Sequence, residues 1–306
     1  MTPHHANGTR PDGKNNRPRT ALLILALLVV VMLIAVEVRH VTTRSAPSAA
    51  QHDALASHPT LSPRVSPDTH NTQHTTHTRR PVTAADVFAG VRIGIDPGHN
   101  GGNFTHPTFI DRRIWNGREQ EACNTTGTAT DDGYTEAKYN FAVATYLRSD
   151  LEQRGARVIM TRYTNSGVGP CVNRRARILD RAHVAVAIDI HADGGPPSGR
   201  GFAILEPVRD GLNNAVVESS HRYGADLQRE FLRTGMPTST YDGTNGINLR
   251  DDLAGLNLTT VPEVLIECGN MRNTTDAKML ISSRFQRRAA QAIMAAMADF
   301  LRSRPG

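Results

Sequence analysis

Two histidines of this 306-residue chain occupy matching places in its sequence. His99 ends the segment IGIDPGH and His191 ends AVAIDIH, and a glycine-bearing turn follows each of them. Ligand sites of open α/β sheets gather at the carboxyl ends of strands, so two imidazoles placed there can share a metal ion. One histidine in such a place is more often structural. Two of the five histidines in residues 83–306 in matching contexts favour a metal site.

Two glutamates could complete such a site. Glu136 follows the potential helix cap Thr135, so it falls in the first turn of a predicted helix, where by itself it would be a partner of the helix dipole. Glu267 ends the apolar run VPEVLIE, where an ionised carboxylate is costly to bury without a partner. Two His and one Glu around Zn²⁺ leave a position open for water, as in hydrolytic zinc sites. Zinc lowers the pKa of water to about 7, and a nearby carboxylate can move its proton to a leaving amine.

Alternating strands and helices must position these residues. Apolar patterning predicts strands over 91–95, 157–160, 184–190, 201–205 and 263–267, and helices over 136–154, 173–182, 213–234 and 284–302. Two of the helices have clear apolar stripes, formed by Tyr139, Val143, Leu147 and Leu151, and by Phe285, Ala289, Ile293, Met297 and Phe300. We therefore predict an α/β fold, a single domain with a twisted, mostly parallel sheet flanked by helices on both faces.

The N-terminal residues read as three further segments. Residues 1–20 are a polar, basic tail, and residues 39–82 are a Ser-, Thr-, Pro- and His-rich segment predicted to be a disordered linker. Residues 21–38 include an apolar run that is slightly long for a signal-peptide core and slightly short for a membrane span. We favour a transmembrane anchor with residues 1–20 in the cytoplasm, and the alternative is a signal peptide that is removed.

Both alternatives export residues 83–306, the predicted catalytic domain. We expect a single-pass protein of the cell membrane with this domain outside or, after signal cleavage, a protein secreted to the periplasm or cell wall. His70, His74 and His77 of the linker are interpreted as solvated rather than metal-binding, because nothing would hold them in place.

Composition and charge exclude other classes of protein. With 39% hydrophobic and 21% charged residues, the chain is neither wholly disordered nor a polytopic membrane protein. The net charge of +6 arises mainly in residues 1–82, which hold nine basic and four acidic side chains, against 26 and 25 in the remainder. Because the folded part is nearly neutral and only 5% of residues are aromatic, we expect no nucleic-acid partner.

Four segments in order resemble the zinc-dependent N-acetylmuramoyl-L-alanine amidases of the Amidase_3 family: DPGHNGG, a Glu opening the next helix, IHADGG and IECGN. Within the family, the chain is most similar to the compact actinobacterial type, through the segments GPCVNRRA, HADGGPPSGRGF and DLAGLNL. The resemblance covers residues 88–303. It implies that His99, Glu136 and His191 bind Zn²⁺, that Glu267 is the catalytic carboxylate, and that peptidoglycan is the substrate. Cys268 departs from the apolar residue, such as Leu, that relatives usually have there.

The predicted reaction is hydrolysis of the amide between N-acetylmuramic acid and the L-alanine of the stem peptide. Two alternatives remain, a zinc peptidase that acts within the stem peptide and a catalytically silent, tethered wall-binding or regulatory protein. Candidate residues at all four positions argue against the silent protein, since binding alone needs no open zinc site beside an acid. No wall-binding repeat is visible in the sequence, so the anchor and linker would have to keep the domain near its substrate.

The three cysteines suggest one disulfide. Cys123 and Cys171 flank the helix at Glu136, and outside the cytoplasm we expect them to pair and to contribute about 3–4 kcal/mol, with Cys268 buried and reduced. No CxxC spacing supports a structural zinc site.

The polar segment 100–134 lies between two predicted ligands and has two interpretations. It is either a surface loop fixed by Cys123 or a cover that restricts access to the metal. Arg250 and Asn257, shortly before Glu267, are candidate substrate contacts, and solvated or capping roles are at least as plausible for both.

Overall fold

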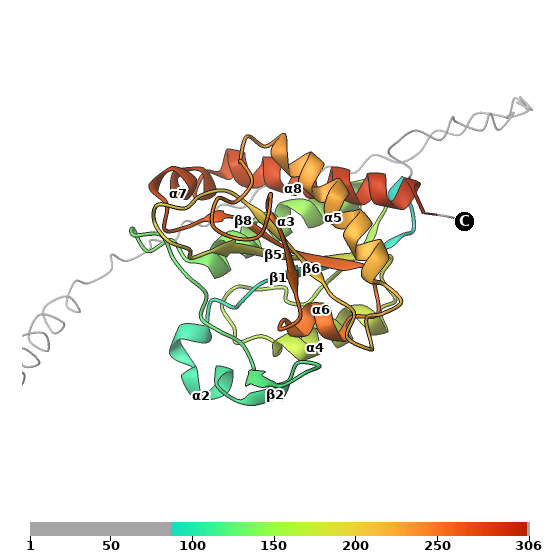
Figure 1. The fold of residues 1–306 in the computed structure, drawn as a ribbon, viewed down its shortest axis with the longest axis horizontal. Coiled ribbons are helices and arrows are strands. Elements are labelled where there is room, and N and C mark those ends of the chain that lie inside the picture. Colours follow the sequence, from blue (N-terminus) through green and yellow to red (C-terminus); the bar gives the residue numbers. More distant parts are fainter. Residues whose placement is uncertain (1–86, 305–306) are drawn as a thin grey trace, which may run out of the picture. The chain divides into compact units, whose positions relative to one another are not determined.

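The computed structural model describes residues 87–304, which fold around a six-stranded sheet (Figure 1). The strand order is β4-β1-β5-β8-β6-β7, and only β6 and β8 pair antiparallel. The strands are β1 (Arg92–Pro97), β4 (Arg157–Met160), β5 (Val186–Asp193), β6 (Ala203–Pro207), β7 (Ile247–Arg250) and β8 (Glu263–Asn270). The predicted mostly parallel sheet is confirmed.

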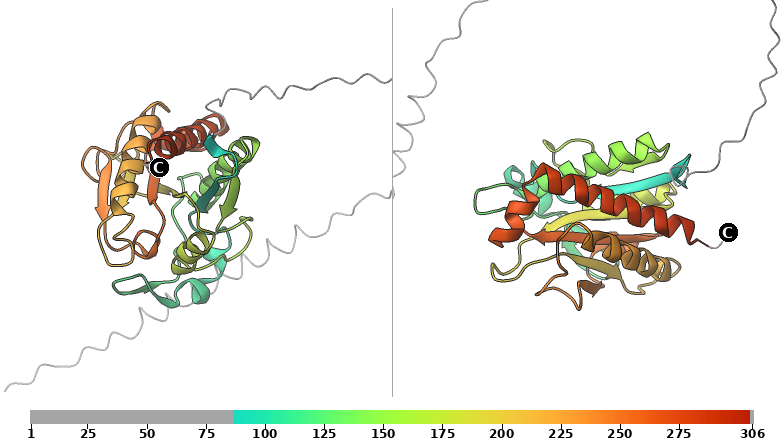
Figure 2. Two further views of the ribbon diagram at one scale, coloured as in Figure 1. Left: turned by 90° about the vertical axis from the view of Figure 1, so that its right-hand side faces the viewer. Right: turned by 90° about the horizontal axis from the view of Figure 1, so that it is seen from above.

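Helices cover both faces of the sheet, as predicted (Figures 1 and 2). One layer consists of α3 (Glu136–Gln153), α5 (Val217–Leu232) and α8 (Ser283–Arg302), with α7 (Thr274–Leu280) beside it. The opposite layer consists of α4 (Val172–Arg181) and the short α6 (Ala254–Leu258). The predicted segments 1–20, 21–38 and 39–82 lie outside the described residues, as do residues 83–86 of the predicted catalytic domain. Within residues 87–304, no helix has both the length and the hydropathy to cross a bilayer.

The main core lies between the sheet and the layer of α3, α5 and α8. Every residue of the two predicted apolar stripes is buried there. Side chains alternate between the faces of a strand, so Ile93 and Ile95 of β1 enter this core while Asp96 faces the α4 and α6 side. The second face therefore has a smaller apolar core and retains polar residues near the carboxyl ends of its strands.

Several short elements were not predicted. Between β1 and α3 lie a 3₁₀ turn η2 (Asn103–Thr105), the helix α2 (Pro107–Ile110), and a hairpin of β2 (Arg113–Trp115) and β3 (Gln120–Ala122). The elements β7, α6 and α7 were also missed. Each spans at most seven residues, which is too few for a hydrophobic period to stand out, and each is stabilised by its neighbours in the fold.

Candidate metal centre

The structure brings together the three residues predicted to bind metal. The possible ligand atoms of His99, Glu136 and His191 all lie within 4.8 Å of one another. Nε2 of His99 is 3.1 Å from Oε2 of Glu136, and Nδ1 of His191 is 2.8 Å from Oε1 of the same carboxylate. Two imidazoles and a carboxylate at this spacing fit Zn²⁺, whose nitrogen and oxygen ligands lie about 2.0–2.2 Å from the ion.

His99 is held by a backbone carbonyl and an arginine side chain from two distant segments. It follows β1 in the left-handed region, with φ of 55°, which a residue other than glycine adopts only when its surroundings fix it. Its Nδ1 donates to the carbonyl of Thr125 at 3.1 Å, and its own carbonyl accepts from Nη2 of Arg175 at 2.7 Å. A hydrogen bond from Nδ1 to a carbonyl fixes the ring so that Nε2 is free for a metal.

Glu136 opens α3, and Thr135 is its N-cap residue as predicted, although the Thr135 side chain makes no capping hydrogen bond. The buried carboxylate accepts backbone N–H groups from Thr128, at 3.0 Å, and from Ala192, at 3.3 Å. Burial alone would raise the pKa of Glu136, but His99 and His191 outweigh it and hold that pKa well below 4.5. Glu136 is therefore poised as an anionic ligand.

The backbone approaches the ligands closely at two glycines. A Cβ at Gly98 would lie 2.1 Å from Nε2 of His191. A Cβ at Gly127, where φ is +72°, would lie 2.7 Å from Cδ2 of His99 and 2.8 Å from Oε2 of Glu136. Larger residues at these positions would displace the ligands themselves.

Glu267 lies beside the three candidate ligands rather than among them. On β8 it is the register partner of His191, and it lines the same cavity. Its Oε2 has no hydrogen-bond partner within residues 87–304. Burial, and then the negative charge of Glu136, raise the pKa of Glu267 well above 4.5 although His191 opposes the shift. This carboxyl can therefore hold a proton that ordinary glutamates lose.

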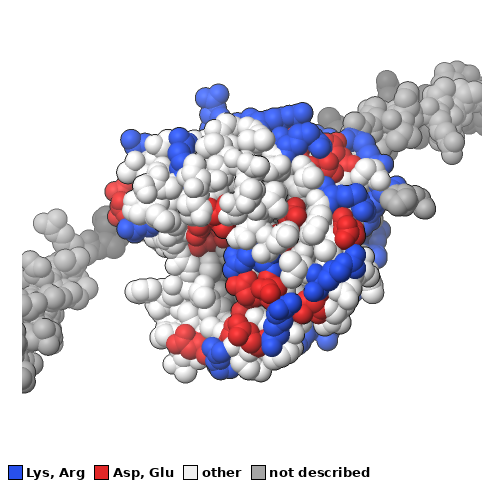
Figure 3. Space-filling view, viewed as in Figure 1, with Lys and Arg blue, Asp and Glu red and all other residues white. Residues whose placement is uncertain are grey.

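The cavity over the ligands has a volume of about 400 Å³, and Figure 3 shows a hollow on this side of the molecule with charged side chains along its edge. Arg250, a predicted substrate contact, lines it and pairs with Asp252 through two contacts of 2.7 Å. Asn257 is buried, and its Nδ2 donates to the carbonyl of Asp251 at 2.8 Å. Asn257 therefore supports the loop before α6, and it is neither solvated nor the cap of this helix, whose caps are Leu253 and Thr259.

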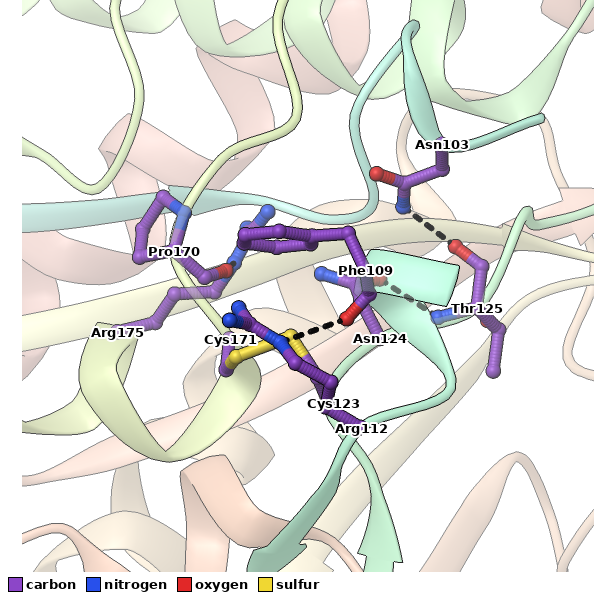
Figure 4. The surroundings of a disulfide bond; sticks show 9 residues. All are labelled: Asn103, Phe109, Arg112, Cys123, Asn124, Thr125, Pro170, Cys171 and Arg175. Atoms are coloured by element: carbon purple, nitrogen blue, oxygen red, sulfur yellow. Dashed lines mark hydrogen bonds between the residues drawn. A yellow bond between two sulfur atoms is a disulfide. The ribbon is translucent and has the colours of Figure 1, made fainter. Parts of the chain in front are cut away.

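The segment 100–134 combines features of both of its interpretations. The predicted disulfide joins Cys123 to Cys171, next to α4 (Figure 4), and Cys268 is buried and free as predicted. Residues near the disulfide, including Thr125 and Gly127, line the cavity at the ligands. Glu121 and Ala122 of β3 also line the cavity. The turn of the β2–β3 hairpin contacts the stretch before α6, where Nδ2 of Asn116 donates to the carbonyl of Asp252 at 3.2 Å.

Sequence reasoning missed a buried ion pair under the site. Arg175 of α4 pairs with Asp96 of β1, and both side chains are almost fully buried. The same guanidinium donates to the carbonyls of Pro97, at 2.9 Å, and His99, so it supports the backbone that carries the first ligand. Arg175 is one of several arginines in the predicted helix. The sequence alone did not show that this arginine is buried while those beside it are exposed.

Comparison with known proteins gives matches over the whole described domain. The Amidase_3 family, described as N-acetylmuramoyl-L-alanine amidase, matches residues 93–299. The chain is 34% identical over 221 residues to the N-acetylmuramoyl-L-alanine amidase Rv3717 of Mycobacterium tuberculosis, which covers 72% of this chain and 90% of that protein.

Two crystal structures of mycobacterial amidases are similar in fold and sequence. The N-acetylmuramyl-L-alanine amidase Ami1 from Mycobacterium smegmatis is 38% identical with a TM-score of 0.67, covering 71% of this chain and 99% of its own. The apo form of Ami1 from Mycobacterium abscessus is 37% identical with a TM-score of 0.66, covering 70% and 99%.

Proposed function

Because this chain belongs to the Amidase_3 family, we propose that it is a zinc-dependent N-acetylmuramoyl-L-alanine amidase that acts on peptidoglycan. It would cleave the amide between N-acetylmuramic acid and the L-alanine of the stem peptide. The observation that carries the proposal is the convergence of His99, Glu136 and His191, with Glu267 lining the same cavity. We assign metal binding to the first three residues and proton transfer to the fourth.

The chemistry supplied by zinc at such a site is polarisation of the scissile carbonyl and a pKa of about 7 for water. The carboxylate of Glu267 accepts a proton from the attacking water at Oε2, the oxygen without a hydrogen-bond partner. It then donates this proton to the leaving nitrogen of L-alanine.

The N-terminal assignments remain proposals, because residues 1–86 lie outside the described part of the chain. We propose that residues 21–38 anchor the protein in the cell membrane with residues 83–306 outside, or that they are removed after export. Protease accessibility of the domain on intact cells, together with the N-terminal sequence of the mature protein, tests both outcomes.

Digestion of purified peptidoglycan tests the proposed reaction. We expect mass spectrometry to find released peptides that begin with L-alanine and a glycan without stem peptides. A chelator should stop the release, and added Zn²⁺ should restore it. Peptides cut within the stem would instead show a zinc peptidase, and wall binding without release would show a silent protein. Glu267→Gln is the matched control, because it preserves the shape of the side chain and removes the base.

A further inference from the structure

A second carboxylate contacts His191 from the side away from Glu136. Asp189 precedes His191 by two residues on β5, so both side chains leave the same face of the sheet. Oδ1 of Asp189 lies 3.3 Å from Nε2 of His191. This oxygen is buried and accepts no hydrogen bond of good geometry within residues 87–304. Oδ1 is therefore an acceptor for which, within residues 87–304, the imidazole of His191 is the nearest available donor.

No arginine or lysine of residues 87–304 forms an ion pair with Asp189. Arg175 is committed to Asp96 and to the carbonyls of Pro97 and His99. The Asp189 side chain is 16% exposed, but its Oδ1 is buried. A buried oxygen without a partner costs free energy, and a hydrogen bond from His191 would offset that cost. The Asp189 oxygen therefore gains a hydrogen bond only when the His191 ring is oriented with Nε2–H toward it.

The ring of His191 is confined so that its two nitrogens have different surroundings. Nδ1 faces Glu136 and the ligand group, whereas Nε2 faces Asp189 and the backbone of Gly98. The environment of His99 is the opposite, because its Nδ1 donates to the carbonyl of Thr125 and its Nε2 faces Glu136. The two histidines thus present different nitrogens to the same centre.

We propose that Asp189 is a positioning residue that accepts Nε2–H of His191 and leaves the Nδ1 lone pair to bind the metal ion. A carboxylate behind a metal-bound histidine fixes the tautomer and the orientation of the ring. The inference rests on the proposed function of this site as a metal centre, and it assigns Asp189 no contact with substrate.

Zinc affinity tests this role without reference to turnover. In competition with a chromophoric chelator, Asp189→Ala should bind Zn²⁺ about 10–100-fold more weakly than the wild-type protein. Asp189→Asn retains an oxygen that can accept Nε2–H, so it should lose less. The matched control is Glu263→Gln, since Glu263 is buried on β8, lines the same cavity and has no contact with His191. Its affinity should stay within twofold of wild type.

The tautomer gives a second measurement that a purely structural role would leave unchanged. In the zinc-loaded protein, ¹⁵N chemical shifts of His191 should show the proton on Nε2. In Asp189→Asn the proton should stay on Nε2 but the Nε2 chemical shift should change, because an amide oxygen is a weaker acceptor than a carboxylate. If Asp189→Ala does not fold, this spectrum and the affinity of Asp189→Asn decide the question.

An Asp189→Ala affinity within twofold of wild type, or an equal loss in Glu263→Gln, would overturn the proposal. A proton found on Nδ1 in the zinc-loaded protein would do the same. A protein that binds zinc in this manner but releases no peptide would refute the proposed amidase activity and leave the role of Asp189 standing.

Discussion

Glu267 on β8 is the direct register partner of His191 on β5 in a parallel pair of strands. Because paired residues in neighbouring strands point to the same face, the proposed base and a proposed ligand are held beside each other by backbone hydrogen bonds. The relative position of these two side chains therefore depends on the sheet rather than on a loop.

Replacing these residues should separate metal binding from proton transfer. Glu267→Ala should retain zinc and lose about 10²–10⁴-fold in turnover, because only the proton-transfer group is removed. His99→Ala should lose both zinc and turnover. Metal analysis of zinc-loaded samples checks the difference, and full zinc occupancy in His99→Ala would show that the ligand assignment is wrong.

Removal of the disulfide should weaken both the fold and the site. The variant Cys123→Ser/Cys171→Ser should lose about 3–4 kcal/mol in the free energy of unfolding, measured in urea. Its zinc affinity should also fall, because Thr125 lies two residues after Cys123 and supports His99. Cys268→Ala is the control: its stability should still drop on addition of reductant, whereas that of the double variant should not respond.

The buried ion pair of Arg175 and Asp96 should behave as a unit. Arg175→Ala leaves the Asp96 carboxylate buried without its cation and should cost about 3–5 kcal/mol in the free energy of unfolding. The double variant Arg175→Ala/Asp96→Ala should be less destabilised than the single one, since no unpaired charge remains. Thermal unfolding of the three proteins measures the coupling, and additive losses would contradict it.

Glu206 on β6 should make stability depend on pH. Burial raises the pKa of Glu206 from 4.5 to about 7, and the nearby His221 opposes the shift. Between pH 4.5 and 7 the unfolded chain has released this proton while the folded protein retains it. The contribution of Glu206 to the free energy of unfolding therefore falls over this range, by about 3 kcal/mol, and then levels off.

Glu206→Gln isolates this effect. The variant should gain stability relative to wild type at pH 8 and show little difference at pH 4, as measured by urea unfolding across the range. A constant difference between the two proteins at all pH values would contradict the raised pKa. Glu218→Gln, an exposed change on α5, controls for the loss of a surface charge.

The sequence was sufficient to predict the helices and strands whose apolar residues recur regularly over several turns or form long continuous runs. The stripes on α3 and α8 specify buried faces, and the apolar runs before His99 and His191 specify central strands. The ends of the strands were less predictable. β5 continues to Asp193 and β8 to Asn270, because backbone pairing with neighbours extends them into polar sequence.

The sequence predicted the site residues whose side-chain type and position indicate metal binding. It did not predict the residues that act only through contacts formed in the folded protein. His99 and Glu136 are recognisable from their positions after a strand and at a helix start. The support of His99 by the carbonyl of Thr125 involves a backbone group, which no residue type reveals. Arg175 acts through partners that are brought near only when α4 packs against the sheet. The contact of Asp189 with His191 depends on the strand conformation, which places both side chains on one face of β5.

Both ends of the described domain lie at the amino ends of the central strands, opposite the metal ligands. The chain enters through Gly90, whose N–H bonds to the carbonyl of Gly155, and Arg304 near the other end contacts the carbonyl of Ala185, just before β5. The six residues of β1 separate this edge from His99 by about 20 Å. A protein immobilised through a tag at Val87 would therefore have its point of attachment on the edge of the sheet opposite the candidate metal ligands, and a polymer could reach the cavity from the free side.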